Sequence, residues 1–480
     1  MSYRPILFTI GILLLILSAS MMFPMIIDLS AQNEDWKVFA ASQCATGFFG
    51  LALVLTTRQE SIKINLKQAF LLTNLSWIVI CIFGAIPFYF GGAGLSITDS
   101  FFETMSGVTT TGSTVIKDLE VLDPGILFWR AMLQWLGGVG ILIMALSILP
   151  MLQVGGMQLF KTESLDMEKV LPSAAKISAY IGILYIILTI ACAAFYALAG
   201  MSVFDAVSHA MTTIATGGYS NYNASMGHFE NPMIEVIAIL FMWIGALPFV
   251  LYLRALRGDW FCIFKDSQVR WFFGIVFAVT AVTVAFLMIE DDWSLFDAVI
   301  YGGFNITSLI TGTGYATSDY NSWGTFIVSL FFFIMCIGGC AGSTACGIKI
   351  FRFQVLYAVT KTQIMKMIMP HGVFPAYYNK KQIPRDVPIA VMSFFFMYAL
   401  IFSLLAVGLS LCGLDFVTAI SGAVTSISNV GPGLGDVIGP VGNFSSLPDT
   451  AKWILSAGML LGRLELFTVL VMLSPRFWRR

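Results

Sequence analysis

The sequence TTTGS at residues 109–113 is one of four related glycine-bearing stretches that decide the fold of this chain. The other three are ATGGY at 215–219, TGTGY at 311–315 and NVGPG at 429–433. Each follows a short amphipathic segment that begins with an aspartate, and each lies between two long apolar segments. Recurrence at a period of roughly 100 residues indicates a repeated structural unit. We therefore predict four units of apolar helix, short helix, glycine loop and returning helix, and call the stretches glycine loops 1 to 4.

The composition places these units in a membrane. Of 480 residues, 58% are hydrophobic and 11% are charged, whereas soluble domains carry roughly a quarter charged residues. Stretches long enough to cross a bilayer, roughly 20 residues each, occur at 5–27, 70–88, 126–149, 177–198, 234–253, 271–289, 326–348, 387–411 and 453–473. We predict an all-α polytopic membrane protein in which two leading helices precede the four units. The first stretch is read as a retained anchor and not as a cleaved signal peptide.

The basic residues predict the orientation. If the crossings alternate from a cytoplasmic amino terminus, most of the 26 Lys and Arg residues fall on the cytoplasmic side. This is the bias that the positive-inside rule describes. Lys37, Lys117, Arg130 and Lys452 fall on the opposite side under this assignment. We therefore expect both termini in the cytoplasm.

Glycine loops at membrane depth indicate a cation pathway. Non-helical backbone is tolerated there only where it is buried in protein or lines a watery cavity. Glycine allows positive φ, so the carbonyl groups can turn inward and replace the hydration shell of a monovalent cation. We expect the aspartates of the short segments to cap the helix starts and the partly negative helix ends to point at the centre. These are Asp99, Asp205, Asp297 and Asp415.

Two features of the loops leave alternatives open. A single Thr/Gly-rich connection could equally be an ordinary turn or a site of close helix packing, and only the fourfold repetition favours a pathway. The distance from aspartate to glycine is 13 residues in the first two units and 17 and 16 in the third and fourth. We read the difference as roughly one extra helical turn in both of the last two units.

With the loops aligned, essentially the whole chain resembles the Trk/Ktr/HKT superfamily of potassium transporters, and more closely the bacterial Trk-type uptake membrane subunit. The sequence Asn429-Val430-Gly431 is nearest to the potassium-channel filter pattern Thr-Val-Gly-Tyr-Gly, and the other loops keep chiefly the central glycine. We therefore expect K⁺ to be discriminated less sharply from Na⁺ and Rb⁺ than in a strict potassium channel. The resemblance implies that one polypeptide supplies a whole pseudo-fourfold pore, with leading helices in 1–66 and pore repeats in 67–160, 161–265, 266–385 and 386–480.

The resemblance also implies a biological setting. It implies multi-pass insertion in the bacterial inner membrane, contact with membrane lipid, a homodimer and a cytosolic nucleotide-binding regulatory subunit. It further implies that K⁺ is the transported ion and is bound in the filter. We expect no partner among the nucleic acids.

The resemblance assigns backbone carbonyls that coordinate K⁺ to two residues of each loop, and a turn-closing glycine to a third. The carbonyl residues are Thr110, Thr111, Thr216, Gly217, Gly312, Thr313, Asn429 and Val430. The filter glycines are Gly112, Gly218, Gly314 and Gly431.

A second glycine-rich stretch, 338–349, lies in the third returning segment and would loosen a helix in mid-membrane. Close helix packing would also explain it, and the spacing does not fit a phosphate-binding loop. The resemblance implies an intramembrane gate below the filter, with an arginine of the last helix beside it. The gate residues are Gly338, Gly339, Gly342, Ser343, Thr344, Gly347, Lys349 and Arg463.

Two other classes of function compete with a pore. A secondary transporter coupling K⁺ to H⁺ or Na⁺ would use broken helices, but it usually has inverted repeats, whereas these units share one orientation. An intramembrane enzyme would need a convergent set of reactive groups, which the dispersed aspartates do not provide. His209, His228 and His371 lack companions at metal-ligand spacing, and the eight cysteines form no metal or disulfide pattern. We read 134–140 as helix packing that could border the inner cavity.

Overall fold

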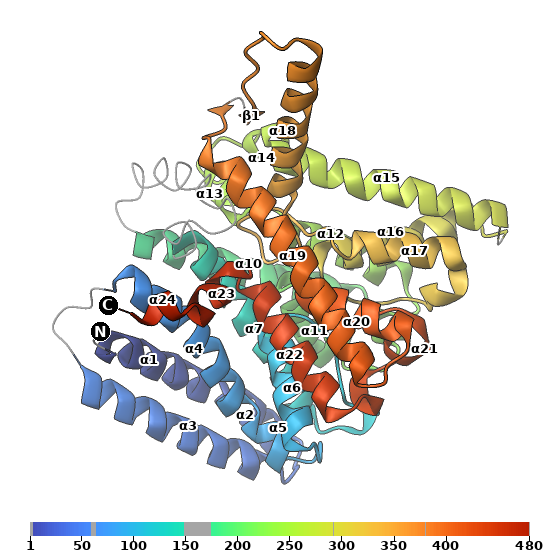
Figure 1. Ribbon diagram of the computed structural model, residues 1–480. Helices are drawn as coiled ribbons and strands as arrows, with labels where there is room; N and C mark the ends of the chain where they lie inside the picture. The colour runs from blue at the N-terminus through green and yellow to red at the C-terminus, as the bar shows by residue number, and fades with distance from the viewer. Residues whose placement is uncertain (1–2, 59–63, 148–173, 291, 380, 480) are drawn as a thin grey trace.

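The computed structural model describes residues 3–58, 64–147, 174–290, 292–379 and 381–479 (Figure 1). The predicted boundary between 67–160 and 161–265 lies outside the described residues. Within them the chain is mostly helical, with a short hairpin of strands β1 (Tyr377–Tyr378) and β2 (Lys381–Gln382). Both ends of the chain lie on the same side of the molecule in Figure 1.

Seven helices of the described part are long and apolar enough to cross a membrane, or up to nine if each of two bent pairs forms one span. The outward faces of these helices carry apolar side chains. On α10 (Ala174–Leu198), for example, Ile183, Ile187 and Ile190 are 54%, 55% and 64% exposed. Helices that are apolar on every face suit lipid contact, because water would disfavour such a surface.

Two candidate spans lead the chain and pack together: α1 (Arg4–Ser20) with α2 (Met22–Ser30) form the first, and α3 (Trp36–Thr57) forms the second. Gly11 of α1 and Gly50 of α3 face each other, since an added side chain at either would come within 3.0 Å of the other's carbonyl oxygen. Small residues permit this close backbone approach.

A long helix, a short helix, a glycine loop and a further helix then follow one another four times. The long helices are α4 (Leu66–Gly84), α10, α15 (Ser267–Glu290) and α19 (Asp386–Leu411). The short helices are α6 (Ile97–Val108), α11 (Val203–Ile214), α16 (Leu295–Thr311) and α20 (Phe416–Ser428). The helices after the loops begin with α7 (Pro124–Ser147), α12 (Pro232–Ala246), α17 (Thr325–Ile334) and α22 (Asp449–Arg463). The remaining α-helices are α5 (Ile86–Phe90), α13 (Phe249–Ala255), α14 (Cys262–Lys265), α18 (Ile350–Ile368), α21 (Gly435–Ile438), α23 (Phe467–Leu473) and α24 (Pro475–Trp478).

The four sets of helices pack against one another in chain order. Helix α7 contacts α11, α12 contacts α16, and α18 contacts α19. Helix α22 then contacts α6, so the last set packs against the first (Figure 1). The short helices and the glycine loops consequently lie at the centre of the molecule.

Three predicted spans are interrupted. The stretch 234–253 bends by 93° between α12 and α13, and 453–473 bends by 113° between α22 and α23. We predicted each as continuous. Pro248, which has no backbone N–H, lies at the first break, and Glu465 and Leu466 have positive φ at the second. The third interruption, between α17 and α18, falls in the glycine-rich stretch where we predicted a broken helix.

The short helices are capped differently from the prediction. Ser96 is the N-cap of α6, and its hydroxyl accepts from the Asp99 N–H at 3.1 Å and donates to the Asp99 carboxylate at 2.9 Å. Ser202 and Ser294 cap α11 and α16 in the same way. Asp415 itself is the N-cap only in α20. A hydroxyl three residues before the carboxylate satisfies the first turn equally well, so the aspartate moves one turn into the helix.

This difference corrects the expected helix lengths. From N-cap to glycine the distance is 16 residues for Gly112, Gly218 and Gly431, and 20 for Gly314. Helix α16 has 17 residues, whereas α6, α11 and α20 have 12, 12 and 13. The extra turn therefore occurs in the third unit, and the prediction of one in the fourth was wrong.

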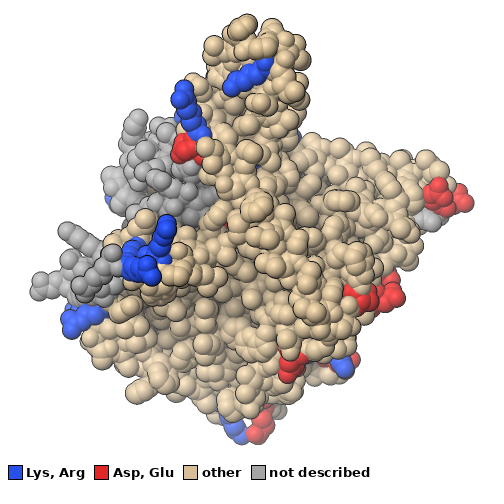
Figure 2. All heavy atoms as spheres, in the orientation of Figure 1, with Lys and Arg blue, Asp and Glu red and all other residues tan. Residues whose placement is uncertain are grey.

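Charged side chains divide between two ends of the surface. In Figure 2 most visible Lys and Arg atoms lie toward the upper left, near the chain ends and around α18 and the β1–β2 hairpin. Most Asp and Glu atoms lie along the lower right edge. The broad tan surface between them is nearly free of charge in this view. An uncharged belt between two charged ends is typical of a protein that spans a bilayer.

Candidate functional site

The four glycine loops share one backbone conformation. In each loop two residues separated by one position have positive φ. The pairs are Thr110 (52°) and Gly112 (91°), Thr216 (50°) and Gly218 (75°), Gly312 (70°) and Gly314 (83°), and Asn429 (53°) and Gly431 (115°). This conformation is unfavourable for threonine, so tertiary contacts must hold Thr110 and Thr216 in place.

The same hydrogen bonds end each short helix. In loop 1 the Thr111 N–H donates to the Ser106 carbonyl at 2.8 Å and the Thr110 N–H to the Gly107 carbonyl at 2.9 Å. The corresponding pairs occur in the other loops, from Gly217 and Thr216, from Thr313 and Gly312, and from Val430 and Asn429. This is a Schellman ending, in which a left-handed residue redirects the chain after the helix. The predicted site residues therefore occupy equivalent positions in all four loops.

Each filter glycine packs against the next loop. A side chain at Gly112 would overlap the carbonyl oxygen of Gly217, and one at Gly218 would overlap that of Thr313. A side chain at Gly314 would overlap the Val430 carbonyl in the same way. The series closes at Gly431, where an added Cβ would lie 2.8 Å from the Thr111 carbonyl oxygen. The loops thus form a ring in which four equivalent carbonyls each face a neighbouring glycine.

Side chains also join loop 1 to loop 4. The Asn429 amide donates to the Thr111 hydroxyl at 2.9 Å, and the Ser113 hydroxyl donates to the Gly431 carbonyl at 2.7 Å. The Thr109 and Thr111 hydroxyls lie 2.8 Å apart, as the Thr311 and Thr313 hydroxyls do at 2.7 Å in loop 3. Polar contacts buried in this way fix the loops relative to one another.

The stretch between α17 and α18, which we call the inner loop (335–349), lies against loops 1 and 2. The Thr216 and Thr344 hydroxyls are 3.3 Å apart, and the Thr110 hydroxyl is 3.5 Å from the Cys346 sulfur. The Thr344 hydroxyl also donates to the Gly245 carbonyl at 2.9 Å and to the Ile214 carbonyl at 3.0 Å. The structure therefore brings Thr344 of the predicted gate directly against a glycine loop.

Backbone hydrogen bonds attach the inner loop to the break between α12 and α13. The Cys340 N–H donates to Ala246, and the Phe249 N–H donates to Gly342, at 3.0 and 2.9 Å. Within the loop, the Gly338 N–H donates to Ile348 at 3.0 Å. A side chain at Gly338 would overlap the Cys346 carbonyl, and one at Gly339 would come within 2.6 Å of Ala345. These glycines let the two arms of the loop lie close together.

Arg463 approaches the inner loop from the end of α22, not from mid-helix as predicted. Its guanidinium donates to the Thr344 carbonyl at 3.3 Å, the Cys346 sulfur at 2.6 Å and the Gly137 carbonyl at 3.4 Å. The residue is 4% exposed, and its Nε–H has no hydrogen-bond partner in the described structure. A cavity of about 30 Å³ lies between this side chain, Asn429 and the inner loop. A space of that size holds about one water molecule.

Further charges surround the inner loop. Lys349 donates to the Ala345 carbonyl, and Arg352 forms a buried ion pair with Glu465. The Arg352 side chain is fully buried. Ser343 donates to Cys340 within the loop, at 2.6 Å. Of the predicted gate residues, Gly347 has the positive φ, 74°, that lets the loop turn toward α18, as Gly342 does at 75°.

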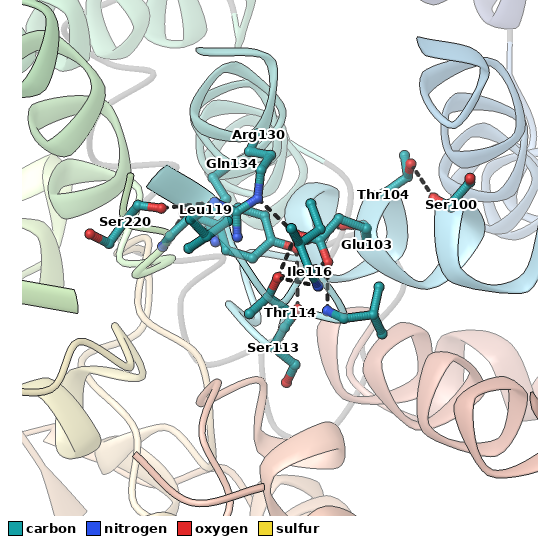
Figure 3. Close-up of polar contacts among 12 residues, drawn as sticks. Ser100, Glu103, Thr104, Ser113, Thr114, Ile116, Leu119, Arg130, Gln134 and Ser220 are labelled. Atoms are coloured by element: carbon teal, nitrogen blue, oxygen red, sulfur yellow. Dashed lines mark hydrogen bonds and ion pairs between the residues drawn. The ribbon is translucent and has the colours of Figure 1, made fainter. Parts of the chain in front are cut away.

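A polar cluster behind loops 1 and 2 was missed by the sequence analysis (Figure 3). Arg130 of α7 lies 2.8 Å from the Glu103 carboxylate of α6, and both are buried. The Arg130 guanidinium also donates to the Ser220 carbonyl at 2.8 Å and lies 4.1 Å from the centre of the Tyr219 ring. One turn further along α7, Gln134 contacts loop 2. The spacing of Arg130 and Gln134 by four residues in an apolar segment was the available signal, because polar side chains at membrane depth usually face a partner.

The described residues include no group of three or more His, Cys, Asp or Glu side chains placed to hold a metal ion. Carbonyl and hydroxyl oxygens are the groups that the glycine loops present. Above the filter glycines, a cavity of about 200 Å³ is lined by residues that include Ser113, Lys117 and Tyr222. The loops therefore separate this outer cavity from the smaller one beside Arg463.

Comparison with known proteins gives consistent similarities. Residues 36–480 match the TrkH family, described as a cation transport protein. The Trk system potassium uptake protein TrkI of Halomonas elongata is 43% identical over 485 residues, which cover 100% of this chain and 97% of that protein. The protein of the same system named TrkH in Escherichia coli K12 is 35% identical, with 100% of both chains covered. The crystal structure of the potassium transporter TrkH from Vibrio parahaemolyticus superposes with a TM-score of 0.92, at 35% identity and with 100% of both chains covered.

Proposed function

Because the chain belongs to the TrkH family of cation transport proteins and is a Trk-type potassium uptake subunit, we propose that K⁺ crosses it through a channel-like pore formed by the glycine loops. The pore is the axis of four helix–loop–helix repeats that follow two leading spans, with repeat boundaries at 67–160, 161–265, 266–385 and 386–480. The chain is a transporter and not an enzyme.

The closed series of contacts between glycines and carbonyls carries this proposal. Four loops from distant parts of the sequence have the same φ pattern and the same hydrogen bonds, and each packs against the next. Only backbone carbonyls recur at equivalent positions around that ring, since the side chains there differ. Carbonyl rings replace the hydration shell of K⁺ in known filters.

Two rings of ligands follow from the positions of the loops. Thr111, Gly217, Thr313 and Val430 supply the outer ring, and Thr110, Thr216, Gly312 and Asn429 supply the inner one. The four short helices end at these residues, so the partial negative charge of each helix end adds to the carbonyl field. Both terms favour a cation over an anion.

The inner loop acts as the gate below this filter. The loop contacts loops 1 and 2 through Cys346 and Thr344, and Arg463 places a buried positive charge against it. A cation leaving the filter would meet this charge in a cavity that holds about one water molecule. The gate must therefore move, together with Arg463, before K⁺ passes.

The setting of the protein follows the same proposal. The chain lies in the bacterial inner membrane with both termini in the cytoplasm, as the division of charge in Figure 2 supports. It forms a homodimer and is controlled by a cytosolic nucleotide-binding regulatory subunit. That subunit would act on the gate through the cytoplasmic helices near α13 and α18.

The test is ion flux into proteoliposomes that hold this protein alone. We expect uptake of K⁺ and Rb⁺ above that of Na⁺ and Li⁺, and a loss of this preference in Gly314→Ser, because the new side chain overlaps the Val430 carbonyl. A variant protein that transports with an unchanged preference would overturn the filter. The wild-type protein is first checked for correct folding by circular dichroism and gel filtration. If the folded protein alone passes no ion, a pore that opens without its regulatory subunit is overturned.

A coupled transporter is the second candidate, and the broken helices favour it. The pairs α12–α13 and α22–α23 are discontinuous helices. In many secondary transporters, discontinuous helices form the ion sites. Reversal potentials separate the two cases. A pure pore follows the K⁺ gradient at every pH and Na⁺ concentration, whereas coupling to H⁺ or Na⁺ moves the reversal potential when either gradient changes.

A further inference from the structure

Loop 2 differs from the other loops at one position. Thr111, Thr313 and Val430 precede the filter glycines of loops 1, 3 and 4, whereas Gly217 holds this place in loop 2. Gly217 is not among the residues with positive φ. Its backbone conformation would therefore accept a side chain, and the reason for glycine must lie in its surroundings.

Gln134 of α7 occupies the space where that side chain would lie. A Cβ added to Gly217 would be 2.5 Å from the Gln134 Cδ, 2.6 Å from its Oε1 and 2.8 Å from its Nε2. In loops 1 and 3 the equivalent space holds a threonine side chain, whose hydroxyl bonds to the threonine two residues earlier. Loop 2 thus takes its polar group from a different helix.

The Gln134 amide holds loop 2 with both of its ends. Its Nε2–H donates to the Gly217 carbonyl at 2.6 Å, and its Oε1 accepts from the Tyr219 N–H at 3.0 Å. The side chain is fully buried and spans the filter glycine Gly218 between these two partners. Arg130, one turn away on α7, fixes the following residue through the Ser220 carbonyl. Figure 3 shows both side chains reaching from α7 toward this loop.

The hydrogen bond changes the Gly217 carbonyl as a ligand. All eight proposed filter carbonyls lie in the described part of the chain. Among these eight, only the Gly217 carbonyl accepts a hydrogen bond from a side chain there. A carbonyl oxygen has two lone pairs, so it can accept the amide and still face a cation. The amide hydrogen, however, places partial positive charge beside that oxygen and restrains its motion. The first effect weakens the field with which the oxygen attracts a small, strongly hydrated cation, and the second limits how far the oxygen can move in toward it.

We propose that Gln134 is a specificity-determining residue of the filter, acting through the Gly217 carbonyl to favour K⁺ over Na⁺. The proposal rests on the pore function proposed above. Gln134 is a positioning residue, because it contacts the ligand group and not the ion. Its removal frees the Gly217 carbonyl and raises the relative flux of small cations.

The first experiment measures Na⁺ and K⁺ flux in proteoliposomes with Gln134→Leu and Gln134→Glu. Leu removes both hydrogen bonds at similar volume, whereas Glu in its ionised form, favoured at high pH, keeps the acceptor for the Tyr219 N–H and loses the donor to Gly217. We expect the ratio of Na⁺ to K⁺ flux to rise about fivefold in both, the factor that corresponds to one ordinary hydrogen bond. If Gln134→Leu does not fold, Gln134→Glu alone decides the outcome.

Asn74→Leu is the matched control. Asn74 is a buried amide of α4 that donates to the Phe70 and Thr468 carbonyls, away from the glycine loops. Its loss should lower stability and leave the flux ratio unchanged. An unchanged ratio in Gln134→Glu, or an equal change in Asn74→Leu, would overturn the proposal.

The second experiment tests the shared space directly. Gly217→Ala should reduce K⁺ flux because its Cβ meets Gln134, and Gln134→Ala added to it should restore much of that flux. A fully active single variant, or a double variant no better than the single, would contradict the arrangement.

Gly314→Ser distinguishes the proposed filter from the proposed role of Gln134. If Gly314→Ser alters the flux ratio while the Gln134 variants do not, the filter stands and the role of Gln134 falls. If none of these variants alters the ratio, the filter assignment itself falls.

Discussion

At the scale of single residues, the ion pair of Arg130 and Glu103 shows how strongly a membrane interior disfavours an unpaired charge. The pair is buried behind loops 1 and 2, and Glu103 also accepts hydrogen bonds from the Thr114 hydroxyl and the Val115 N–H. Arg130→Met would leave the carboxylate without its cation. We expect this change to lower the free energy of unfolding by about 3–5 kcal/mol, seen as a lower Tm in detergent.

The double variant Glu103→Gln with Arg130→Met should recover part of that loss, because no charge then remains buried. Lys37→Met provides the comparison, since Lys37 pairs with Glu34 at an exposed position where ion pairs contribute little. Equal Tm changes in Arg130→Met and Lys37→Met would contradict the structural role of the buried pair.

Arg463 is the residue on which the gate proposal depends most directly. Its guanidinium contacts the Thr344 carbonyl and the Cys346 sulfur, so Arg463→Ala removes both a positive charge and two contacts of the inner loop. We expect K⁺ flux to rise about tenfold, the factor that corresponds to one hydrogen bond of a charged group. Proteoliposome uptake of ⁸⁶Rb⁺ measures this flux.

The control is Arg476→Ala, at an exposed position of α24, which should leave ⁸⁶Rb⁺ uptake unchanged. Equal uptake in both variants would exclude Arg463 from the gate.

At the scale of elements, the Thr344 side chain joins the inner loop to three neighbouring elements. Its hydroxyl reaches the Gly245 and Ile214 carbonyls and the Thr216 hydroxyl, and so joins α12, α11 and loop 2. Thr344→Val keeps the shape and removes these contacts. We expect ⁸⁶Rb⁺ uptake to rise about fivefold, as the loss of one net hydrogen bond implies.

Ser343→Ala is the control within the same loop, because the Ser343 hydroxyl bonds only to Cys340 within the described residues. Its uptake should stay within about twofold of wild type, near the low end for one hydrogen bond, because this bond does not attach the inner loop to α12 or to a glycine loop. A larger effect at Ser343 than at Thr344 would show that flexibility inside the loop, and not its attachment to α12, controls the passage.

The sequence predicted the elements better than their ends. Hydrophobic length located the spans, and the repeated glycines located the four loops, because each signal is local to its segment. The breaks at Pro248 and at Glu465 were missed, since both lie in stretches as apolar as an unbroken helix. The aspartate caps were misplaced because Ser96 and its equivalents offer a hydroxyl three residues earlier, and either group can satisfy a first turn.

The candidate site could be predicted only where its residues act through their own backbone. The positive φ of the four loop glycines could be expected from the sequence, because that conformation restricts a position to few residue types. Gln134, Arg130 and Glu103 act through contacts with residues more than ten positions away, and no local pattern encodes such a partner. The burial of Arg352 could not be predicted for the same reason, since its partner Glu465 lies more than a hundred positions further along the chain.

At the scale of the whole molecule, the ring of loops predicts that damage to any one quarter is felt by all. Each filter glycine faces the carbonyl of the next loop, so a new Cβ displaces a carbonyl that we propose as a K⁺ ligand and that belongs to a different loop. Gly112→Ala, Gly218→Ala, Gly314→Ala and Gly431→Ala should therefore each lower the ratio of K⁺ to Na⁺ flux. We expect about tenfold, since positive φ and the overlap together cost more than about 1.4 kcal/mol.

Gly182→Ala sets the baseline for this series, because nothing lies within 4 Å of the position of its added Cβ on α10. Its flux ratio and Tm should match those of wild type. The four ring variants, although they lie in four repeats, should resemble one another more than any of them resembles Gly182→Ala. If only one or two of them changed the ratio, K⁺ would be selected by part of the ring, and the equivalence of the four carbonyls would be wrong. Since the contact of Gly431 with Thr111 joins the last repeat to the first, the effect of Gly431→Ala is the decisive measurement of whether the ring acts as one unit.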